Sequence, residues 1–580
     1  MIKQRIKPDQ FGKRTALVTV FLFFMFLAVG ARLFFLQVIN GKAARALAED
    51  QHSIFTKLLA QRGEIKISDK FSKEPITVAG NIKKPLVYAV PKDVLDPGQT
   101  AIQLAAILKI DEQEILKRFE DKSRKYVPIK RQITEKQQED IKALKLPGIF
   151  FDYEEIRVYP ENNLLSHVLG YVGYKDQRKE GLYGLERYFE KELAGKNGSL
   201  LEEAGAKGNW VFGATRDRQP AEDGVNLILT IDKSIQFKAE SVVKEAVKKH
   251  GADSGSVIVS DPKTGAVLAM AGYPDFSPNE YNKVDDPQIF LNQASVGAYE
   301  SGSVFKPLTM AMAINEGKVG PDTIYTDAGF VEIDGHTIKN SDLKAHGKQT
   351  MTQVLEQSLN TGAIFAKEQI GNDKFFDYVK AFGFGKSTGL ELLEHKGNLD
   401  NLKADIKVNY HTASFGQGIS VTPIQLIQAF SAIANGGKMM KPHLVKAKID
   451  SDGRYEETPN IVVKEVIADK TANTVAAMMV SVVENGHGKR AGVKGYYIAG
   501  KTGTAQVPRK DGKGYEEGNN IGSFIGFGPA EDPKFLMLVR INHPRDVTFA
   551  ESTAAPAFGE IAQFILNYYN IPPTRLDQQQ

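Results

Sequence analysis

Residues 300–307 read Glu300-Ser301-Gly302-Ser303-Val304-Phe305-Lys306-Pro307, a loop that runs into a helix. Gly302 allows a sharp entry, and apolar residues then recur at the i, i+3/i+4 spacing of a buried helix face as far as Gly317. Proline is tolerated only near a helix start, so Pro307 places the first turn close to Ser303. Ser303 and Lys306 are then neighbours on one face of the helix.

This Ser-x-x-Lys spacing is suited to nucleophilic catalysis. A serine hydroxyl is a poor nucleophile by itself, but a partly desolvated lysine amine held beside it can accept its proton. Taken alone the tetrad is common, and it also occurs by chance on solvated helices. Its meaning therefore depends on the rest of the chain.

Two later runs complete a known combination. Ser358-Leu359-Asn360 follows a helical stretch, where a loop can direct a hydroxyl and an amide into a cleft. Gly500-Lys501-Thr502-Gly503-Thr504 lies on a predicted strand, where glycine leaves room for a substrate backbone and Lys501 supplies charge for a carboxylate. The order SxxK, SxN, KTGT is that of serine acyl-transfer enzymes, whose middle motif is usually Ser-Asp-Asn.

Composition excludes several other classes of function. The chain has 580 residues, which predicts at least two domains, and its formal net charge is only +4. No basic tract with interleaved aromatic residues indicates nucleic-acid binding. Cysteine is absent, which excludes disulfides and thiolate chemistry, and the ten histidines have no metal-ligand spacing. We expect neither a metal nor a cofactor.

The N-terminus predicts a membrane anchor. Residues 1–14 carry five positive charges and one negative charge, and the 17 residues from Thr15 to Ala31 carry none. We predict a cytoplasmic arm over residues 1–14 and a single transmembrane helix over residues 15–39, with the rest of the chain outside the cytoplasmic (inner) membrane. A cleavable signal peptide would have a shorter apolar region ending in small residues. A buried core helix is the other alternative.

The remaining sequence predicts a pedestal over residues 40–220 and a larger domain over residues 221–570, followed by a tail. The pedestal has predicted helices at 42–51, 96–119 and 134–144 and no nucleophile–base pair, so a structural or partner-binding role is expected. In the larger domain, strands occur at both ends and largely helical sequence runs from Ser303 to about residue 437. This pattern predicts an α+β fold, in which an antiparallel sheet shares a core with a helical lobe and a ligand groove lies between them.

These motifs resemble those of the class B penicillin-binding proteins, and the likeness spans nearly the whole chain. Besides the three runs above, it includes Arg62-Gly63-x-Ile65, Arg157-x-Tyr159-Pro160, Gly184-Leu185-Glu186, Leu229-Thr230-Ile231-Asp232 and Ser523-Phe524-Ile525-Gly526-Phe527. The last run, with Gly514-Tyr515 upstream, is more similar to the division-type (septal, FtsI-type) branch than to the elongation-type branch. Two positions depart from the family pattern: Ser301 replaces the usual proline, and the usual Asp-Arg-Asn-Gly after Arg62-Gly63 is missing.

The resemblance implies a peptidoglycan D,D-transpeptidase with an acyl-serine intermediate. Ser303 is then the nucleophile, Lys306 alone or with Ser358 relays its proton, and Asn360 holds the substrate amide. Lys501, Thr502, Gly503 and Thr504 are then the substrate-binding strand. The implied ligands are a D-Ala-D-Ala donor, an amine acceptor and beta-lactams. The implied partners are a multi-spanning glycan polymerase and other divisome proteins.

Several alternatives remain open at this point. An elongation-type transpeptidase fits the same motifs. A membrane-anchored beta-lactamase would gain nothing from a pedestal, and a beta-lactam sensor would need more cytoplasmic sequence than 14 residues. Gly385-Lys386-Ser387-Thr388-Gly389 matches a hydrolase elbow but follows a predicted helix end, so we predict a loop. Tyr410 and His411 have no partner visible in the sequence, and structural roles are expected.

Overall fold

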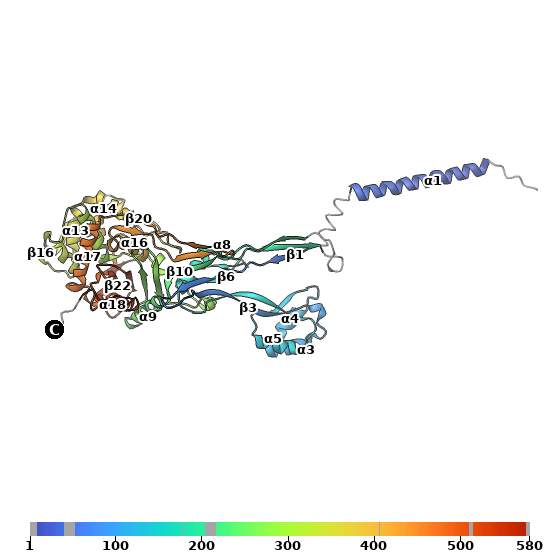
Figure 1. Ribbon diagram of the computed structural model, residues 1–580, viewed down its shortest axis with the longest axis horizontal. Helices are drawn as coiled ribbons and strands as arrows, with labels where there is room; N and C mark the ends of the chain where they lie inside the picture. Colours follow the sequence, from blue (N-terminus) through green and yellow to red (C-terminus); the bar gives the residue numbers. More distant parts are fainter. Residues whose placement is uncertain are drawn as a thin grey trace, which may run out of the picture. The chain divides into compact units, whose positions relative to one another are not determined.

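The computed structural model describes residues 9–39, 53–176, 178–203, 216–404, 406–509 and 514–575 (Figure 1). The chain divides into two compact units. The first contains Met1–Gln61 and Gly195–Asp223, and the second contains Arg62–Ala194 and Gly224–Gln580. A chain of this length is too long for one ordinary hydrophobic core, which agrees with the division into two units.

The first unit contains an apolar helix and a small sheet. Helix α1 (Asp9–Phe34) continues into a π-helical turn, η1 (Phe35–Ile39). Within α1, Thr15–Phe34 has a mean hydropathy of 2.3 and no buried residues, which suits a membrane span. The predicted helix at 42–51 lies outside the described residues. The sheet is antiparallel, with β8 between its two partners: β1 (Ser53–Leu58), β8 (Gly198–Glu203) and β9 (Arg216–Gln219).

A seven-stranded sheet runs through the second unit and joins its early and late segments. Strand β10 (Asn226–Asp232) pairs with β2 (Ile65–Ser68) on one side and with β18 (Val445–Ile449) on the other. Residues on both sides of the predicted domain boundary at residue 220 therefore share one sheet. The remaining strands are β3 (Ile76–Ala89), β4 (Val127–Lys130), β5 (Ile149–Val158) and β19 (Tyr455–Glu457).

Three helices pack against β3, β4 and β5 around a separate small core. The sequence predicted one continuous helix over 96–119, and this was wrong. The structure has two helices, α3 (Pro97–Leu108) and α4 (Glu112–Phe119), because Lys109 adopts the left-handed conformation and Asp111 caps the second helix. The third helix, α5 (Glu135–Ala143), begins at a capping box, as a Thr-x-x-Gln sequence predicts.

Three separate pedestal motifs meet at one buried carboxylate, that of Glu186. Its oxygens accept hydrogen bonds from Arg62 Nε at 2.8 Å, Arg157 Nε at 2.6 Å and the Tyr159 hydroxyl at 3.2 Å. Burial by itself would raise the pKa of Glu186, but the two guanidinium groups more than compensate and hold it below its usual value. The cluster ties β5 and α7 (Gly184–Tyr188) to the start of the second unit.

Replacing Glu186 by glutamine is expected to lower the free energy of unfolding by about 3–5 kcal/mol, because two buried guanidinium groups lose their counter-charge. The matched control is Glu190→Gln, since Glu190 also contacts Arg62, at 2.7 Å, but is 27% exposed. That change should cost less than about 1 kcal/mol. Denaturant titration of the full chain measures both. Because folding lowers the pKa of Glu186, the ionised carboxylate stabilises the folded chain at pH values above the ordinary glutamate pKa. This stabilisation is lost as the pH falls through the pKa that Glu186 has in the folded chain. Equal losses in the two variants would contradict this role.

A five-stranded antiparallel sheet forms the centre of the larger domain. Its order is β12-β11-β23-β22-β21, so β21 lies at one end. Helices α9 (Lys233–Lys249) and α18 (Ala554–Tyr568) cover one face, and the Ser303 segment and α16 (Pro423–Ala434) cover the other. The strands are β11 (Ser254–Ser260), β12 (Val267–Tyr273), β21 (Ala499–Pro508), β22 (Tyr515–Gly528) and β23 (Phe535–Asn542).

The helical lobe lies beside this sheet, where Figure 1 shows α13, α14, α16 and α17 close together. Besides α16, the helices of the lobe are α11 (Lys306–Asn315), α12 (Met351–Glu356), α13 (Asn360–Glu368), α14 (Gly371–Ala381), α15 (Lys407–Ala413) and α17 (Asp469–Glu484). The α+β class with a helical lobe is confirmed. The expectation of largely helical sequence up to residue 437 was wrong for residues 324–350. That segment forms two short ladders: β13 (Ile324–Asp327) with β16 (Gly347–Thr350), and β14 (Phe330–Ile333) with β15 (His336–Lys339).

Candidate active site

The turn that carries Ser303 is tighter than the sequence predicted. Gly302–Phe305 forms a 3₁₀ turn, η5, and the α-helix α11 begins only at Lys306. Residues three apart eclipse one another in a 3₁₀ turn, so Ser303 and Lys306 lie on the same side of it. Gly302 is essential to this path because its φ is +58° and a β-carbon there would lie 3.1 Å from the Thr504 carbonyl oxygen.

The Lys306 amine is completely buried and faces the second motif. It donates a hydrogen bond to the Ser358 carbonyl oxygen and lies 3.3 Å from Ser358 Oγ. Burial, followed by the nearby charge of Lys501, lowers the pKa of Lys306 well below its ordinary value. The neutral amine therefore forms at a lower pH than in free lysine, which favours its use as a proton acceptor for a serine hydroxyl.

Ser358 joins the two lysines. It lies between α12 and α13 with a φ of +58°, a conformation that few residues other than glycine adopt. Its Oγ accepts a hydrogen bond from Lys501 Nζ at 3.0 Å and has Lys306 Nζ on its other side. A serine hydroxyl has two acceptor sites and one donor hydrogen. Both lysine amines therefore converge on this one hydroxyl.

Strand β21 brings the third motif against the turn that carries Ser303. Gly503 permits this contact, because a β-carbon there would lie 2.8 Å from Val304 Cγ1 and 3.0 Å from the Ser301 carbonyl oxygen. Lys501 is fully buried, and its Nζ also donates to the Thr502 carbonyl oxygen at 3.0 Å. Burial lowers the pKa of Lys501 to about 7. The Thr504 hydroxyl accepts a hydrogen bond from the Ala550 N–H at 3.2 Å.

A buried polar network fixes the second motif, and no pattern in the sequence indicates it. The Asn360 side chain donates to the Lys339 carbonyl oxygen at 2.8 Å, and the Asn360 N–H donates to Asn340 Oδ1 at 2.9 Å. Asn340 in turn donates to Asp327, which also accepts a hydrogen bond from Thr361. Asp327 and Asn340 belong to the segment that the sequence analysis expected to be helical. The unexpected ladders therefore hold Asn360 in position.

A second positioning group lies behind Gly503 on the same face of the sheet. Gly503 pairs with Ser523, and Ser523 pairs with Arg540 on the next strand. The Tyr299 hydroxyl donates to Ser523 Oγ at 3.3 Å, and the Arg540 guanidinium lies 4.2 Å from the centre of the Tyr299 ring. Burial lowers the pKa of Arg540 to about 10. These contacts fix the segment just before the nucleophile turn against β22 and β23.

The other residues that the sequence analysis singled out make contacts outside the three motifs. Gly385–Gly389 is a loop after α14, as predicted. The Tyr410 hydroxyl donates to the Leu402 carbonyl oxygen, and His411 contacts the Glu368 carboxylate at 3.1 Å. Within the described residues, no group of three or more His, Cys, Asp or Glu side chains is placed to hold a metal ion.

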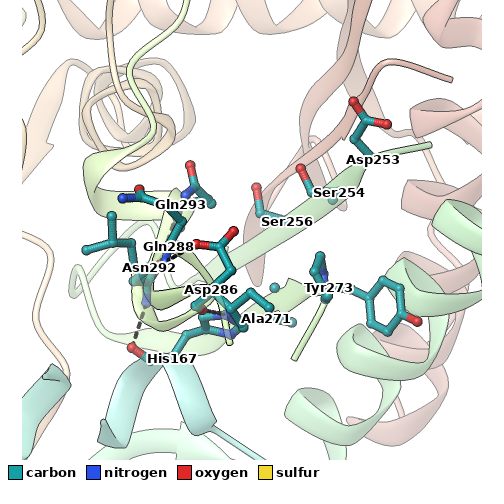
Figure 2. Close-up of a pocket in the computed structure, with 16 residues that line it drawn as sticks. His167, Asp253, Ser254, Ser256, Ala271, Tyr273, Asp286, Gln288, Asn292 and Gln293 are labelled. Atoms are coloured by element: carbon teal, nitrogen blue, oxygen red, sulfur yellow. Dashed lines mark hydrogen bonds between the residues drawn. The ribbon is translucent and has the colours of Figure 1, made fainter. Parts of the chain in front are cut away.

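A separate cavity of about 250 Å³ lies at the β11–β12 end of the sheet (Figure 2). Its lining includes Ser256, Asp286, Gln293 and the buried imidazole of His167. Burial lowers the pKa of His167 to about 4, so the ring is neutral at physiological pH. No residue of the three motifs lines this cavity, so the chemistry is not centred there.

Comparisons with known proteins agree with this geometry. Residues 255–563 match the family model of the penicillin binding protein transpeptidase domain, and residues 57–229 match that of the penicillin-binding protein dimerisation domain. The chain is 37% identical to stage V sporulation protein D of Bacillus subtilis, over 98% of this chain and 88% of that protein. It is 31% identical to the peptidoglycan D,D-transpeptidase FtsI of Escherichia coli, over 88% and 84% of the two chains.

Solved structures show the same fold. Penicillin binding protein 2X of Streptococcus thermophilus superposes with a TM-score of 0.74 at 24% identity, covering 89% of this chain and 80% of that one. Penicillin binding protein 3 of Mycobacterium tuberculosis, complexed with aztreonam, superposes with a TM-score of 0.68 at 25% identity, covering 90% and 100%.

Proposed function

Because this chain belongs to the penicillin-binding protein transpeptidase family, we propose that it is a peptidoglycan D,D-transpeptidase whose nucleophile is Ser303. The observation that carries the proposal is the meeting of two buried lysine amines at Ser358 Oγ, beside the turn that presents Ser303. Like charges so close together favour a neutral form for one of them. Lys306, whose pKa is lowered both by burial and by the charge of Lys501, is that group.

In the acylation step, Ser303 Oγ attacks the carbonyl carbon of the penultimate D-Ala of a stem peptide. Its proton passes to the Lys306 amine, directly or through the Ser358 hydroxyl. The bond to the terminal D-Ala then breaks, and the leaving amine takes that proton. An ester between Ser303 and the shortened stem remains.

Other residues orient the donor and stabilise developing charge. Lys501, Thr502 and Thr504 bind the terminal carboxylate, Gly503 leaves room for the peptide, and Asn360 holds a donor amide. The backbone N–H groups of Ser303 and Thr504 form the oxyanion hole, where loss of a single donor typically costs ~10²–10³ in rate. In the second step the amine of a neighbouring stem attacks the ester, Ser303 regains its proton, and a cross-link forms.

Mapping a covalent adduct tests this assignment. Beta-lactams imitate the D-Ala-D-Ala end, so benzylpenicillin should add its full mass to the chain, on the peptide that contains Ser303. Mass spectrometry of a digest locates the adduct. Release of D-Ala from a stem pentapeptide, together with a cross-linked product when an amine acceptor is present, separates transpeptidation from simple hydrolysis. An adduct on any other peptide would contradict the proposal.

The cellular role follows from the anchor and the relatives. We place residues 1–14 in the cytoplasm and the catalytic domain outside it, because of the positive charge of residues 1–14. The similarity to FtsI supports a role in septal wall synthesis beside a multi-spanning glycan polymerase and other divisome proteins. The higher identity to the sporulation protein favours, as a second candidate, the same chemistry during spore formation. The distribution of a fluorescent fusion in dividing and sporulating cells separates these roles.

A further inference from the structure

A partly buried carboxylate lies three residues before the proposed nucleophile and has no role in the acylation step. Glu300 Oε2 accepts a hydrogen bond from the Tyr515 hydroxyl at 3.0 Å. Burial raises the pKa of Glu300, and hydrogen bonds from Tyr515 and the Gly418 N–H only partly oppose this shift. Among the described residues, no cation is in ion-pair contact with this carboxylate. It is therefore a desolvated acceptor without a counter-charge among the residues that the structure describes.

The surroundings of Glu300 place it at one end of the substrate strand. Gly416 lies against Gly302, whose N–H donates to the Gly416 carbonyl oxygen at 3.1 Å. The neighbouring Gln417 donates to Gln506 Oε1 at 3.3 Å. Gln506 is two residues beyond Thr504 on β21, and Tyr515 pairs with Pro508 on the same strand. Glu300, Tyr515, Gln417 and Gln506 therefore form one polar cluster past the carboxylate-binding threonines.

The proposed function fixes where a donor would run from that point. Its terminal carboxylate lies at Thr502 and Thr504, and its scissile carbonyl lies at Ser303. An antiparallel peptide beside β21 then extends toward Gln506, because strands advance about 3.3 Å per residue. The donor residue two positions before the terminal D-Ala consequently lies near Gln506 and the Glu300 cluster.

The donor stem carries an amine as well as its D-Ala end. A transpeptidase joins two stems of the same kind, one through its D-Ala end and the other through an amine. Every stem that can serve in both roles must therefore carry both groups, and a donor brings a free ammonium of its own. An ammonium group has three donor hydrogens and a positive charge, which complement a desolvated carboxylate.

We infer that Glu300, with Tyr515 and Gln417 around it, binds the side-chain ammonium of the donor stem and so selects donors whose amine is not yet cross-linked. This inference rests on the proposed function. The acceptor amine is a different possible source of the same chemistry. A carboxylate stabilises the protonated form of an amine, however, and that form cannot attack an ester. The charge at Glu300 therefore suits the donor and opposes activation of the acceptor.

Two stem pentapeptides that differ only by acetylation of the side-chain amine test the inference. The rate of D-Ala release by the full chain, without added acceptor, should be about 10- to 100-fold higher for the free amine, as for a hydrogen bond between charged groups. In Glu300→Gln this preference should fall to about 1. In Glu245→Gln, which makes the same charge change on α9 across the sheet, it should stay at the wild-type value. Tyr515→Phe and Glu300→Asp keep the carboxylate and should keep most of the preference.

The possible outcomes separate the two claims. Equal rates with the two donors in the wild-type chain, with penicillin still attached to Ser303, would overturn the inference and leave the proposed function standing. An adduct elsewhere than Ser303 would overturn both.

A second measurement tests whether Glu300 binds the acceptor amine instead. With the acetylated donor and an added amine acceptor, the ratio of cross-linked to hydrolysed product measures how well the acceptor is used. A fall in that ratio in Glu300→Gln, with the donor preference unchanged, would assign Glu300 to the acceptor and overturn the inference. If Glu300→Gln does not fold, as judged by thermal melting, Glu300→Asp and Tyr515→Phe still decide the outcome, because loss of the preference in both would contradict a carboxylate-based site.

Discussion

Replacing Ser303 by alanine is expected to abolish covalent labelling by fluorescent penicillin, with a loss of at least about 10³-fold in the acylation rate. Alanine removes only the oxygen atom that forms the ester, and it leaves the backbone N–H of residue 303 in place. Lys306, Ser358 and Lys501 keep their contacts with one another, because none of those contacts passes through Ser303. Gel fluorescence at a fixed time, followed by a time course, measures the loss.

The chain offers a matched control two residues away. Ser301 is completely buried, and within the described residues its Oγ has no hydrogen-bond partner. Ser301→Ala therefore removes an oxygen from the same turn without leaving a partner unsatisfied. It should keep the wild-type labelling rate and a folded chain. Persistent labelling of Ser303→Ala would place the nucleophile elsewhere, and loss of labelling in both variants would show that the turn, not the hydroxyl, had been disturbed.

Local sequence signals predicted much of the fold. Asp232 is a residue type that favours helix N-caps, and its side chain accepts hydrogen bonds from the N–H groups of Ser234 and Ile235 at the start of α9. The strands at both ends of the larger domain were also predicted, because a sheet covered on both faces has nearly continuous apolar strands, as in Phe535-Leu536-Met537-Leu538-Val539. Caps and periodicity act within a few residues, so one sequence suffices to find them.

The contacts that complete the candidate site were not predictable in this way. The ladders at 324–350 have strands of only four residues, too short to show a period. Asp327 and Asn340 hold Asn360 through contacts that only the folded chain creates. In the pedestal, three short motifs were noted by resemblance, but the sequence did not show that Glu186 joins Arg62 and Arg157. Polar networks formed across long sequence separations leave no periodic trace.

The spacing of Ser303 and Lys306 was the decisive local signal, yet its geometry differs from the expected one. An α-helix was predicted from near Ser303, and a 3₁₀ turn is present. Gly302 and Gly503 explain the tighter turn. The turn and β21 pack so closely at these two positions that a β-carbon on either residue would be crowded by the other segment. The tetrad is therefore shaped by a strand some 200 residues later in the chain, which is a tertiary effect.

Replacing Lys306 is expected to slow acylation by about 10³-fold, within the range for loss of a general base. Lys306→Ala and Lys306→Met should behave alike in rate, since both remove the amine and only methionine fills its volume. Thermal stability of Lys306→Met should match or exceed that of the wild type. Among the described residues, the neighbours of the buried amine are the Ser358 oxygens and another lysine, and no carboxylate compensates its charge. Stopped-flow measurement with a chromogenic beta-lactam gives the rates.

The pH profile identifies the role of the amine. Because burial and Lys501 lower the pKa of Lys306, the neutral amine forms at lower pH than in free lysine. The wild-type acylation rate should therefore rise with pH and level off well below 10.5, the ordinary lysine pKa. This rise should be missing in Lys306→Met. The matched control is Lys367→Met, which removes another fully buried lysine, one whose amine donates to Asn372 and lies 5.4 Å from the Tyr410 ring. That variant should keep both the rate and the rise, because its amine lies outside the three motifs. An ordinary rate in Lys306→Met would remove this lysine from the proton transfer and leave Ser358 with Lys501 to perform it.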